Sequence, residues 1–274
     1  MTRFISSPPT GTAAATGMPP LWTLFQRRAT CGESGVSLDL CAPSHGLAVP
    51  VDGAELAAPA HHLLGIDLRL AGQAPASSGP SEQWVRGNDC TAIYEPSDER
   101  ALRATVMWRQ WPAPTTGQPL SLAVWEVVVS AQTALLQSDP TLEVVSQIAR
   151  AGEVLSGRWL PGGMAFSQTA APTPAPAPKS APAPAPAAAA GLLVRTGAGR
   201  SVLVLAHPAE EQRLEAVSAA DACRVTCSLF SQPVEKGVLL RSRVLAAIGP
   251  VTGDTVWAAE VAASFAASPP VLST

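Results

Sequence analysis

The chain has 274 residues, of which 47% are hydrophobic and only 14% are charged, and its formal net charge is −3. This length and apolar content predict one large domain or two small ones, and the slight negative charge argues against a general affinity for nucleic acid. The sequence contains no run of the roughly 18 apolar residues that a membrane-spanning helix needs, and no apolar core of a signal peptide. We therefore expect a cytoplasmic protein without a nucleic-acid or membrane partner.

Strand patterns dominate the first part of the chain. Residues 1–19 are rich in Ser, Thr and Pro and predict a disordered tail. Residues 64–70 and 102–108 have apolar side chains at every second position, which predicts strands with one buried face. Residues 121–131, SLAVWEVVVSA, are apolar at both odd and even positions and are rich in Val. They predict a central strand that is covered on both faces.

The segment 167–190 is the clearest landmark of the sequence, because it contains the run APTPAPAPKSAPAPAPAAAA. Alternating Ala and Pro form neither helix nor sheet, since Pro lacks a backbone N–H and restricts the residue before it. Such a run favours an extended polyproline II rod. We predict a disordered linker or an extruded loop that separates an N-terminal β unit, 20–166, from a C-terminal β unit, 191–274.

The C-terminal unit begins with strands and ends with a helix. Residues 223–229 and 238–244 alternate in the same way as the earlier strands. Further along, Trp257, Val261 and Phe265 lie four residues apart, which predicts one short helix with a single apolar face. An acidic residue at the start of this helix, Asp254, can act as its cap.

Together these elements predict a mainly β fold of two antiparallel, sandwich-like units with one short helix near the C-terminus. The two units either pack together as one supersandwich or lie apart like beads on a semi-rigid string. A faint repeat favours the packed arrangement. It pairs IYEPSDER at 93–100 with LAHPAEEQ at 205–212, each of which combines a strand end, a proline and an acidic pair.

Glu126 is the most unusual residue of the predicted central strand, because it shares a face with Val124 and Val128. A carboxylate in such surroundings is desolvated, which raises its pKa unless an arginine pairs with it. The functional interpretation is a general acid or base in a cleft. The simpler interpretation is an ion pair, with Arg86 or Arg109 as the partner, or a strand edge that is open to water.

Two further pairs of residues are candidates for ligand binding. Arg241 and Arg243 project to the same side of a predicted strand, about 6.6 Å apart, and can hold a carboxylate, a phosphate or an acidic sugar. The alternative is an ordinary solvated sheet face. Trp84 and Trp111 are the tryptophans that we expect to be most exposed, and flat aromatic faces of this kind stack on sugar rings.

The sequence predicts neither a metal site nor a cofactor. The neighbours His61 and His62 point to opposite faces of a strand, while Cys223 and Cys227 are about 13 Å apart on one. We expect the five cysteines to be buried free thiols. Dinucleotide-binding, P-loop, nucleophile-elbow and zinc-protease motifs do not occur in the sequence, so catalytic activity is not predicted.

Three stretches carry a resemblance to known sequences: 85–109, 234–244 and 265–274. They resemble an uncharacterised family of bacterial β-rich proteins, in which a V-R-G-x-D segment comes first and an E-K-G-V-x-x-R-x-R-V segment lies near the end. That family has no known activity, so the resemblance implies no functional residue. The second stretch is also similar to the closing strands of sugar-epimerase-like β-supersandwich proteins.

The leading functional hypothesis is a non-catalytic binding or protein-interaction module, since no catalytic motif occurs. The rival is a carbohydrate-binding or sugar-epimerase-like supersandwich protein, and a structural scaffold is a third class. The partner is then a protein or a saccharide. The rival needs an exposed tryptophan beside a carboxylate and an arginine in one pocket, so clustering of Glu126 with Arg241 or Arg243 favours it.

Overall fold

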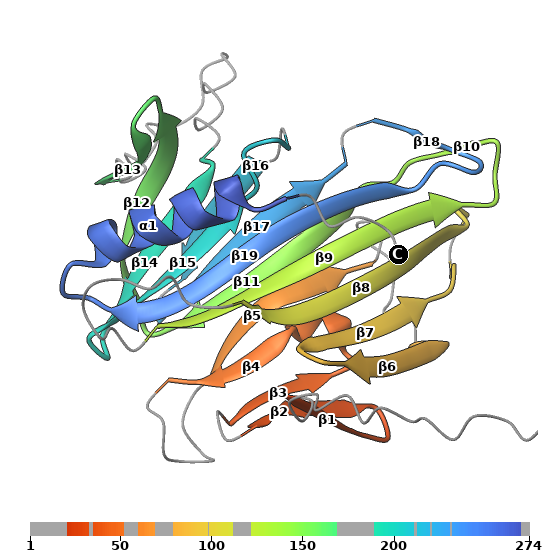
Figure 1. Ribbon diagram of the computed structural model, residues 1–274, viewed down its shortest axis with the longest axis horizontal. Coiled ribbons are helices and arrows are strands. Elements are labelled where there is room, and N and C mark those ends of the chain that lie inside the picture. The colour runs from red at the N-terminus through yellow and green to blue at the C-terminus, as the bar shows by residue number, and fades with distance from the viewer. Residues whose placement is uncertain are drawn as a thin grey trace, which may run out of the picture.

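The structure is a computed structural model of the chain. It describes residues 21–32, 35–51, 60–68, 79–97, 99–111, 122–168, 189–210, 213–219, 221–230 and 232–269. The described residues form a mainly β protein with two large antiparallel sheets and one C-terminal helix (Figure 1), so the predicted fold class is confirmed. None of the helices in these ranges is long and apolar enough to cross a membrane.

Sheet A has eight strands, which come from both ends of the chain. They are β1 (Trp22–Phe25), β2 (Arg28–Cys31), β3 (Val36–Asp39), β4 (Leu47–Pro50), β5 (Ala60–Asp67), β11 (Leu142–Ala149), β16 (Arg213–Ala219) and β17 (Ala222–Leu229). Their order across the sheet is β1-β2-β3-β4-β5-β11-β17-β16. The short 3-10 helix η2 (Pro43–His45) connects β3 to β4.

Sheet B has nine strands. They are β6 (Glu82–Arg86), β7 (Asp89–Tyr94), β8 (Leu102–Trp111), β9 (Ala123–Thr133), β12 (Ala151–Leu160), β13 (Gly163–Gln168), β14 (Gly191–Thr196), β15 (Arg200–Ala206) and β19 (Leu240–Pro250). Their order is β13-β12-β14-β15-β19-β9-β8-β7-β6. A separate two-stranded ribbon pairs β10 (Gln137–Ser138) with β18 (Val234–Glu235).

The main hydrophobic core lies between the inner faces of the two sheets. The alternation predicted for 102–108 is confirmed in β8, where Ala104, Val106 and Trp108 are buried. They join one cluster with residues of sheet A such as Leu38 and Val225. Each large apolar side chain buried in this way contributes about 1.5–3 kcal/mol to the free energy of folding.

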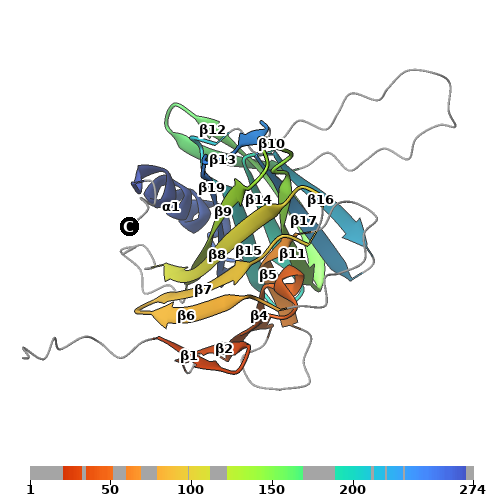
Figure 2. The ribbon, with the colours of Figure 1, turned by 90° about the vertical axis from the view of Figure 1, so that its right-hand side faces the viewer.

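The helix α1 (Asp254–Ala267) covers the outer face of sheet B (Figure 2). Its buried face contains Trp257, Val261 and Phe265, as the sequence predicts, and these residues pack in a second apolar cluster with residues of β9, β14, β15 and β19. The predicted cap is wrong. Gly253 occupies the cap position, while the carboxylate of Asp254 accepts hydrogen bonds from Arg195.

The two sheets do not follow the predicted division into units 20–166 and 191–274. Sheet A combines β1–β5 and β11 with β16 and β17, and sheet B inserts β14, β15 and β19 between β12 and β9. Strands from both sides of the Ala-Pro segment therefore share both sheets and one core. Most of that segment, 169–188, and the predicted tail, 1–19, lie outside the described residues.

The faint repeat does not correspond to two copies of one β unit. After the first copy the chain stays in sheet B, because β7, β8 and β9 are neighbours there. After the second copy it leaves β15 of sheet B and forms β16 and β17 in sheet A. The similarity of 93–100 and 205–212 is thus confined to a strand end followed by a proline.

Candidate functional site

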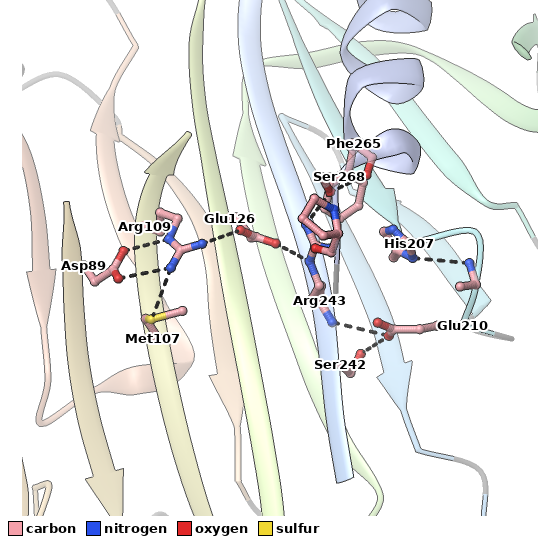
Figure 3. A network of polar contacts seen from close by, with 12 residues as sticks. Asp89, Met107, Arg109, Glu126, His207, Glu210, Ser242, Arg243, Phe265 and Ser268 are labelled. Carbon is pink, nitrogen blue, oxygen red and sulfur yellow. Dashed lines mark hydrogen bonds and ion pairs between the residues drawn. The ribbon is translucent and has the colours of Figure 1, made fainter. Parts of the chain in front are cut away.

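The predicted carboxylate lies in a row of charged residues on the outer face of sheet B. Asp89, Arg109 and Glu126 stand directly opposite one another on β7, β8 and β9, so their side chains share one face. Arg243 on β19 lies diagonally across from Glu126, because its direct partner is Val128. Figure 3 shows these four residues as a chain of alternating charges across the sheet.

Glu126 is completely buried, and Arg243 is its main partner. The exposed fraction of Glu126 is 0%. The Nε of Arg243 donates a hydrogen bond of 2.5 Å to Oε1 of Glu126. The two terminal nitrogens of the guanidinium donate to the carbonyl of Pro269 at 2.9 Å and to the hydroxyl of Ser268 at 2.7 Å. Arg243 therefore joins β9 and β19 to the chain that follows α1.

Two aromatic rings enclose the guanidinium of Arg243. Its Cζ lies 4.8 Å from the ring centroid of Phe265 and 5.6 Å from that of Trp111. The two rings meet edge to face, with their centroids 5.7 Å apart. Cation–π contacts stabilise a guanidinium that has lost its water. Trp111 is thus part of the packing around Arg243, and it is not the freely exposed tryptophan that the sequence predicts.

Arg109 connects the buried carboxylate to Asp89. Its Nε and a terminal nitrogen donate to the two carboxylate oxygens of Asp89 at 2.7 and 3.1 Å. Its other terminal nitrogen lies 3.8 Å from Oε2 of Glu126, a buried oxygen without a hydrogen-bond partner among the described residues. Burial raises the pKa of Glu126, while the charges of Arg243 and Arg109 act against this rise.

A second carboxylate approaches Arg243 from the turn after β15. Glu210 accepts hydrogen bonds from the hydroxyl of Ser242 and, at 3.3 Å, from the backbone N–H of Arg243. Burial raises the pKa of Glu210, and these hydrogen bonds act against the rise. The nearby ring of His207 packs edge to face on Phe265, and burial together with the charge of Arg243 lowers the pKa of His207. Glu210 and His207 therefore extend the network of Glu126 and Arg243 to the turn after β15.

The network binds structural elements together and does not present a reactive group. A general acid or base must come within about 2.6–3.2 Å of the atom whose proton it transfers. Glu126 has no exposed surface from which to do so. The geometry therefore supports the ion-pair interpretation of Glu126. The sequence suggests Arg86 or Arg109 as the partner of Glu126, and Arg109 is indeed a neighbour. The closest partner is Arg243, which the sequence analysis assigned to anion binding instead.

The other predicted binding residues are dispersed over the outer face of sheet B. Arg241 shares this face with Arg243, but its Nε donates to the hydroxyl of Ser130 at 3.0 Å, so each arginine has its own partner within the protein. Trp84 lies on the edge strand β6 and is 41% exposed, which agrees with its predicted exposure. These residues do not form a common pocket with Glu126.

Sequence reasoning missed a cluster of exposed aliphatic side chains at one end of the molecule. The ribbon of β10 and β18 extends there beyond the long strands β9 and β19 (Figure 1), and the N–H of Lys236 donates to the carbonyl of Leu136. Leu135, Leu136, Val238 and Leu239 are 41, 85, 41 and 44% exposed, and we call these four residues the apolar tip. Two of them, Val238 and Leu239, were expected inside a strand.

No local signal reveals the apolar tip, because its two halves are about a hundred residues apart in the chain. An open hollow of about 420 Å³ lies beside it, lined by β10, Asp139, Gln232 and Pro233. Hydrogen bonds from Thr141 lower the pKa of Asp139, so this carboxylate stays charged at neutral pH. Polar residues of this hollow therefore lie on the same ribbon of β10 and β18 that carries the apolar tip.

The described residues contain no group of three or more His, Cys, Asp or Glu side chains that could hold a metal ion. His61 is buried and His62 faces outward, so the pair points to opposite faces as expected. All five cysteines are free thiols, but Cys41 is exposed, contrary to the prediction. No protein-family model matches the chain, and no curated protein matches it either.

Proposed function

We propose that the protein is a non-catalytic protein-interaction module that places the apolar tip in a groove of a partner protein. The observation that carries this proposal is the tip itself, four exposed aliphatic side chains on two turns that are held together by β10 and β18. Single exposed aliphatic residues are ordinary, but contiguous patches with a polar border mark contact surfaces.

The shape of this region suits a protein partner better than a small molecule. The tip stands at the end of β9 and β19, two eleven-residue strands that pair with each other over most of their length. The hollow beside β10, with Asp139 and Gln232, supplies hydrogen-bonding groups near the tip. Protein interfaces combine an apolar centre with a polar rim. The partner expected is a protein with an apolar groove flanked by hydrogen-bond donors.

The carbohydrate alternative is only partly supported by the geometry. It requires a carboxylate, an arginine and an exposed tryptophan in one pocket, and Glu126, Arg243 and Trp111 do come together. However, Glu126 is completely buried and Trp111 packs against Phe265, so no aromatic face is open to a sugar beside the carboxylate. The more exposed Trp84 lies on β6, three strands away from β9.

Site-specific photo-crosslinking of the full-length protein tests the proposal. A benzoylphenylalanine is placed at Leu136 in the tip or, as the control, at Val256 on α1, which is 63% exposed. Irradiation in cells that make the protein should join a different protein to position 136 and not to position 256. Equal adducts at both positions, or an adduct that contains only two copies of this chain, would contradict the proposal.

A second set of variants tests whether crosslinking depends on the apolar tip itself or on any exposed apolar side chain. With the crosslinker at Leu135, the double change Leu136→Asp and Leu239→Asp should reduce the adduct at least about tenfold, because it places two charges in the apolar contact. Val217→Asp on β16, a residue that is 66% exposed, should leave the adduct unchanged. A neutral sugar that stabilises the protein and loses this effect on Trp84→Ala would instead favour the carbohydrate alternative.

A further inference from the structure

A different site lies on the outer face of sheet A, and it does not depend on the apolar tip. A hollow of about 210 Å³ opens there, and it is lined by residues of η2, β5, β11 and β17. The polar residues that matter are His45, His62, Asp67, Gln147 and Arg224. Pockets for drug-sized ligands measure about 300–1,000 Å³, so this hollow fits a smaller molecule.

Two glycines allow η2 to lie directly on β5 and so to form one wall of the hollow. A Cβ atom at Gly65 would be 2.2 Å from the carbonyl oxygen of Ser44, and one at Gly46 would be 2.2 Å from that of Leu63. Gly46 also has a φ of +62°, which favours glycine. No larger residue fits at this crossing, and the crossing is what brings His45 over the strand.

The strand β5 is irregular at the same place. Its pairing with β11 shifts register between Val145 and Gln147, which marks a β-bulge. Leu64 has a φ of +56°, an unusual value for a residue with a side chain, and its N–H donates to the buried hydroxyl of Ser146 at 3.0 Å. Bulges and strained residues redirect side chains and cluster at functional sites. This bulge buries Leu64 and leaves His62 facing the hollow.

The side chains around the hollow provide both hydrogen-bond donors and acceptors. Gln147 stands directly opposite His62 on one side and Arg224 on the other, so these three side chains form a row across β5, β11 and β17. The Nδ1 atom of His62 is buried and has no hydrogen-bond partner within the described part of the chain. Its ring lies 5.5 Å from that of His45. Burial and the neighbouring His45 lower the pKa of His62, so its ring is neutral at pH 7.

We infer that the hollow binds a small carboxylic acid that also carries hydroxyl groups, a ligand of the sugar-acid class. Arg224 and Gln147 donate hydrogen bonds to the ligand carboxylate, since a guanidinium pairs with a carboxylate through two parallel bonds. Asp67 accepts hydrogen bonds from ligand hydroxyls, and the neutral ring of His62 forms the wall beside them. The carboxylate thus lies toward β17 and the hydroxyl groups lie toward β5 and η2.

Isothermal titration calorimetry of the full-length protein with three probes tests this inference. D-Gluconate carries both the carboxylate and the hydroxyls, D-glucose lacks the carboxylate, and acetate lacks the hydroxyls. Gluconate should bind at least about tenfold more tightly than either of the other probes, because only gluconate engages both halves of the hollow. Glucose or acetate that binds as tightly as gluconate would overturn the inference, and so would the absence of gluconate binding.

Variants place the binding in the hollow. Arg224→Gln removes the guanidinium of an exposed side chain and should weaken gluconate binding at least about tenfold. Asp67→Asn keeps the size of the side chain, replaces the carboxylate that accepts from the ligand hydroxyls and should also weaken binding. Arg28→Gln is the matched control, since Arg28 is an exposed arginine on β2 of the same sheet. Gluconate binding that responds equally to Arg28→Gln, or not at all to Arg224→Gln, would contradict the assignment.

Discussion

Glu126 and Arg243 illustrate how a single residue can determine the stability of this protein. Both side chains are almost completely removed from water and they neutralise each other. We expect Glu126→Leu to lower the free energy of unfolding by about 3–5 kcal/mol, because it leaves the charge of Arg243 buried without its main partner. Urea denaturation followed by circular dichroism measures this change.

The double variant Glu126→Leu with Arg243→Met is the control for this prediction. It removes both charges at once, so it should be more stable than Glu126→Leu alone, although it lacks more native contacts. A single variant as stable as the unchanged protein would show that the pair does not hold the sheet together.

The sequence was sufficient to indicate that Glu126 needs a cation, but not to identify it. A carboxylate among valines on a central strand must be paired or protonated, and this argument requires only the local pattern. Arg243, however, is 117 residues away in the chain. Its proximity depends on the register between β9 and β19, which no local pattern encodes.

At the scale of elements, the crossing of η2 over β5 is the most demanding feature. Gly65→Ala should lower the free energy of unfolding by at least about 2 kcal/mol, because the new methyl group would overlap the backbone of Ser44. Gly162→Ala is the control, since a Cβ there meets nothing within 4 Å, and its effect should stay within about 0.5 kcal/mol. Equal stability of the two variants in chemical denaturation would show that the segment is free to move aside.

Strands and the helix were predictable where the spacing of apolar residues determined which face is buried. The alternation in β8 and β17 and the four-residue spacing in α1 identified their buried faces correctly. The pattern failed at the start of β19, where Val238 lies before the strand and is exposed. The alternation continues there in the sequence, but the pairing of β19 with β9 begins only at Leu240, so Val238 lies in the turn before the strand and outside the sheet.

Both sheets of the molecule combine strands from the two parts of the chain that precede and follow the Ala-Pro segment. We expect fragments 1–178 and 179–274 to show no cooperative thermal unfolding when each is made alone, because each lacks strands of both sheets, including the central strands of sheet B in fragment 1–178. When they are produced together they should copurify and unfold in one transition, which differential scanning calorimetry can measure. A fragment that unfolds cooperatively by itself would contradict this prediction.

The fold class was predictable from the sequence, but the distribution of the strands between the two sheets was not. Composition and strand periodicity are local properties, and they predict a mainly β protein with one helix. The Ala-Pro segment suggested a boundary between two units, because such boundaries are usually rich in proline. In the structure β13 pairs with β12 up to Gln168 before this segment, and Ala189 bridges to Leu214 after it, so the described residues on both sides of the segment belong to the two shared sheets.

The central position of β19 has a consequence for the synthesis of the protein. More than a hundred residues separate β9 from β19 in the chain. At ordinary translation rates β9 therefore leaves the ribosome on the order of ten seconds before β19 does. During this delay the apolar strand β9 has one edge without its final neighbour, and an open edge of this kind can pair with another chain. The yield of native protein should therefore depend on translation speed and on chaperones that shield the nascent chain until its last hundred residues emerge.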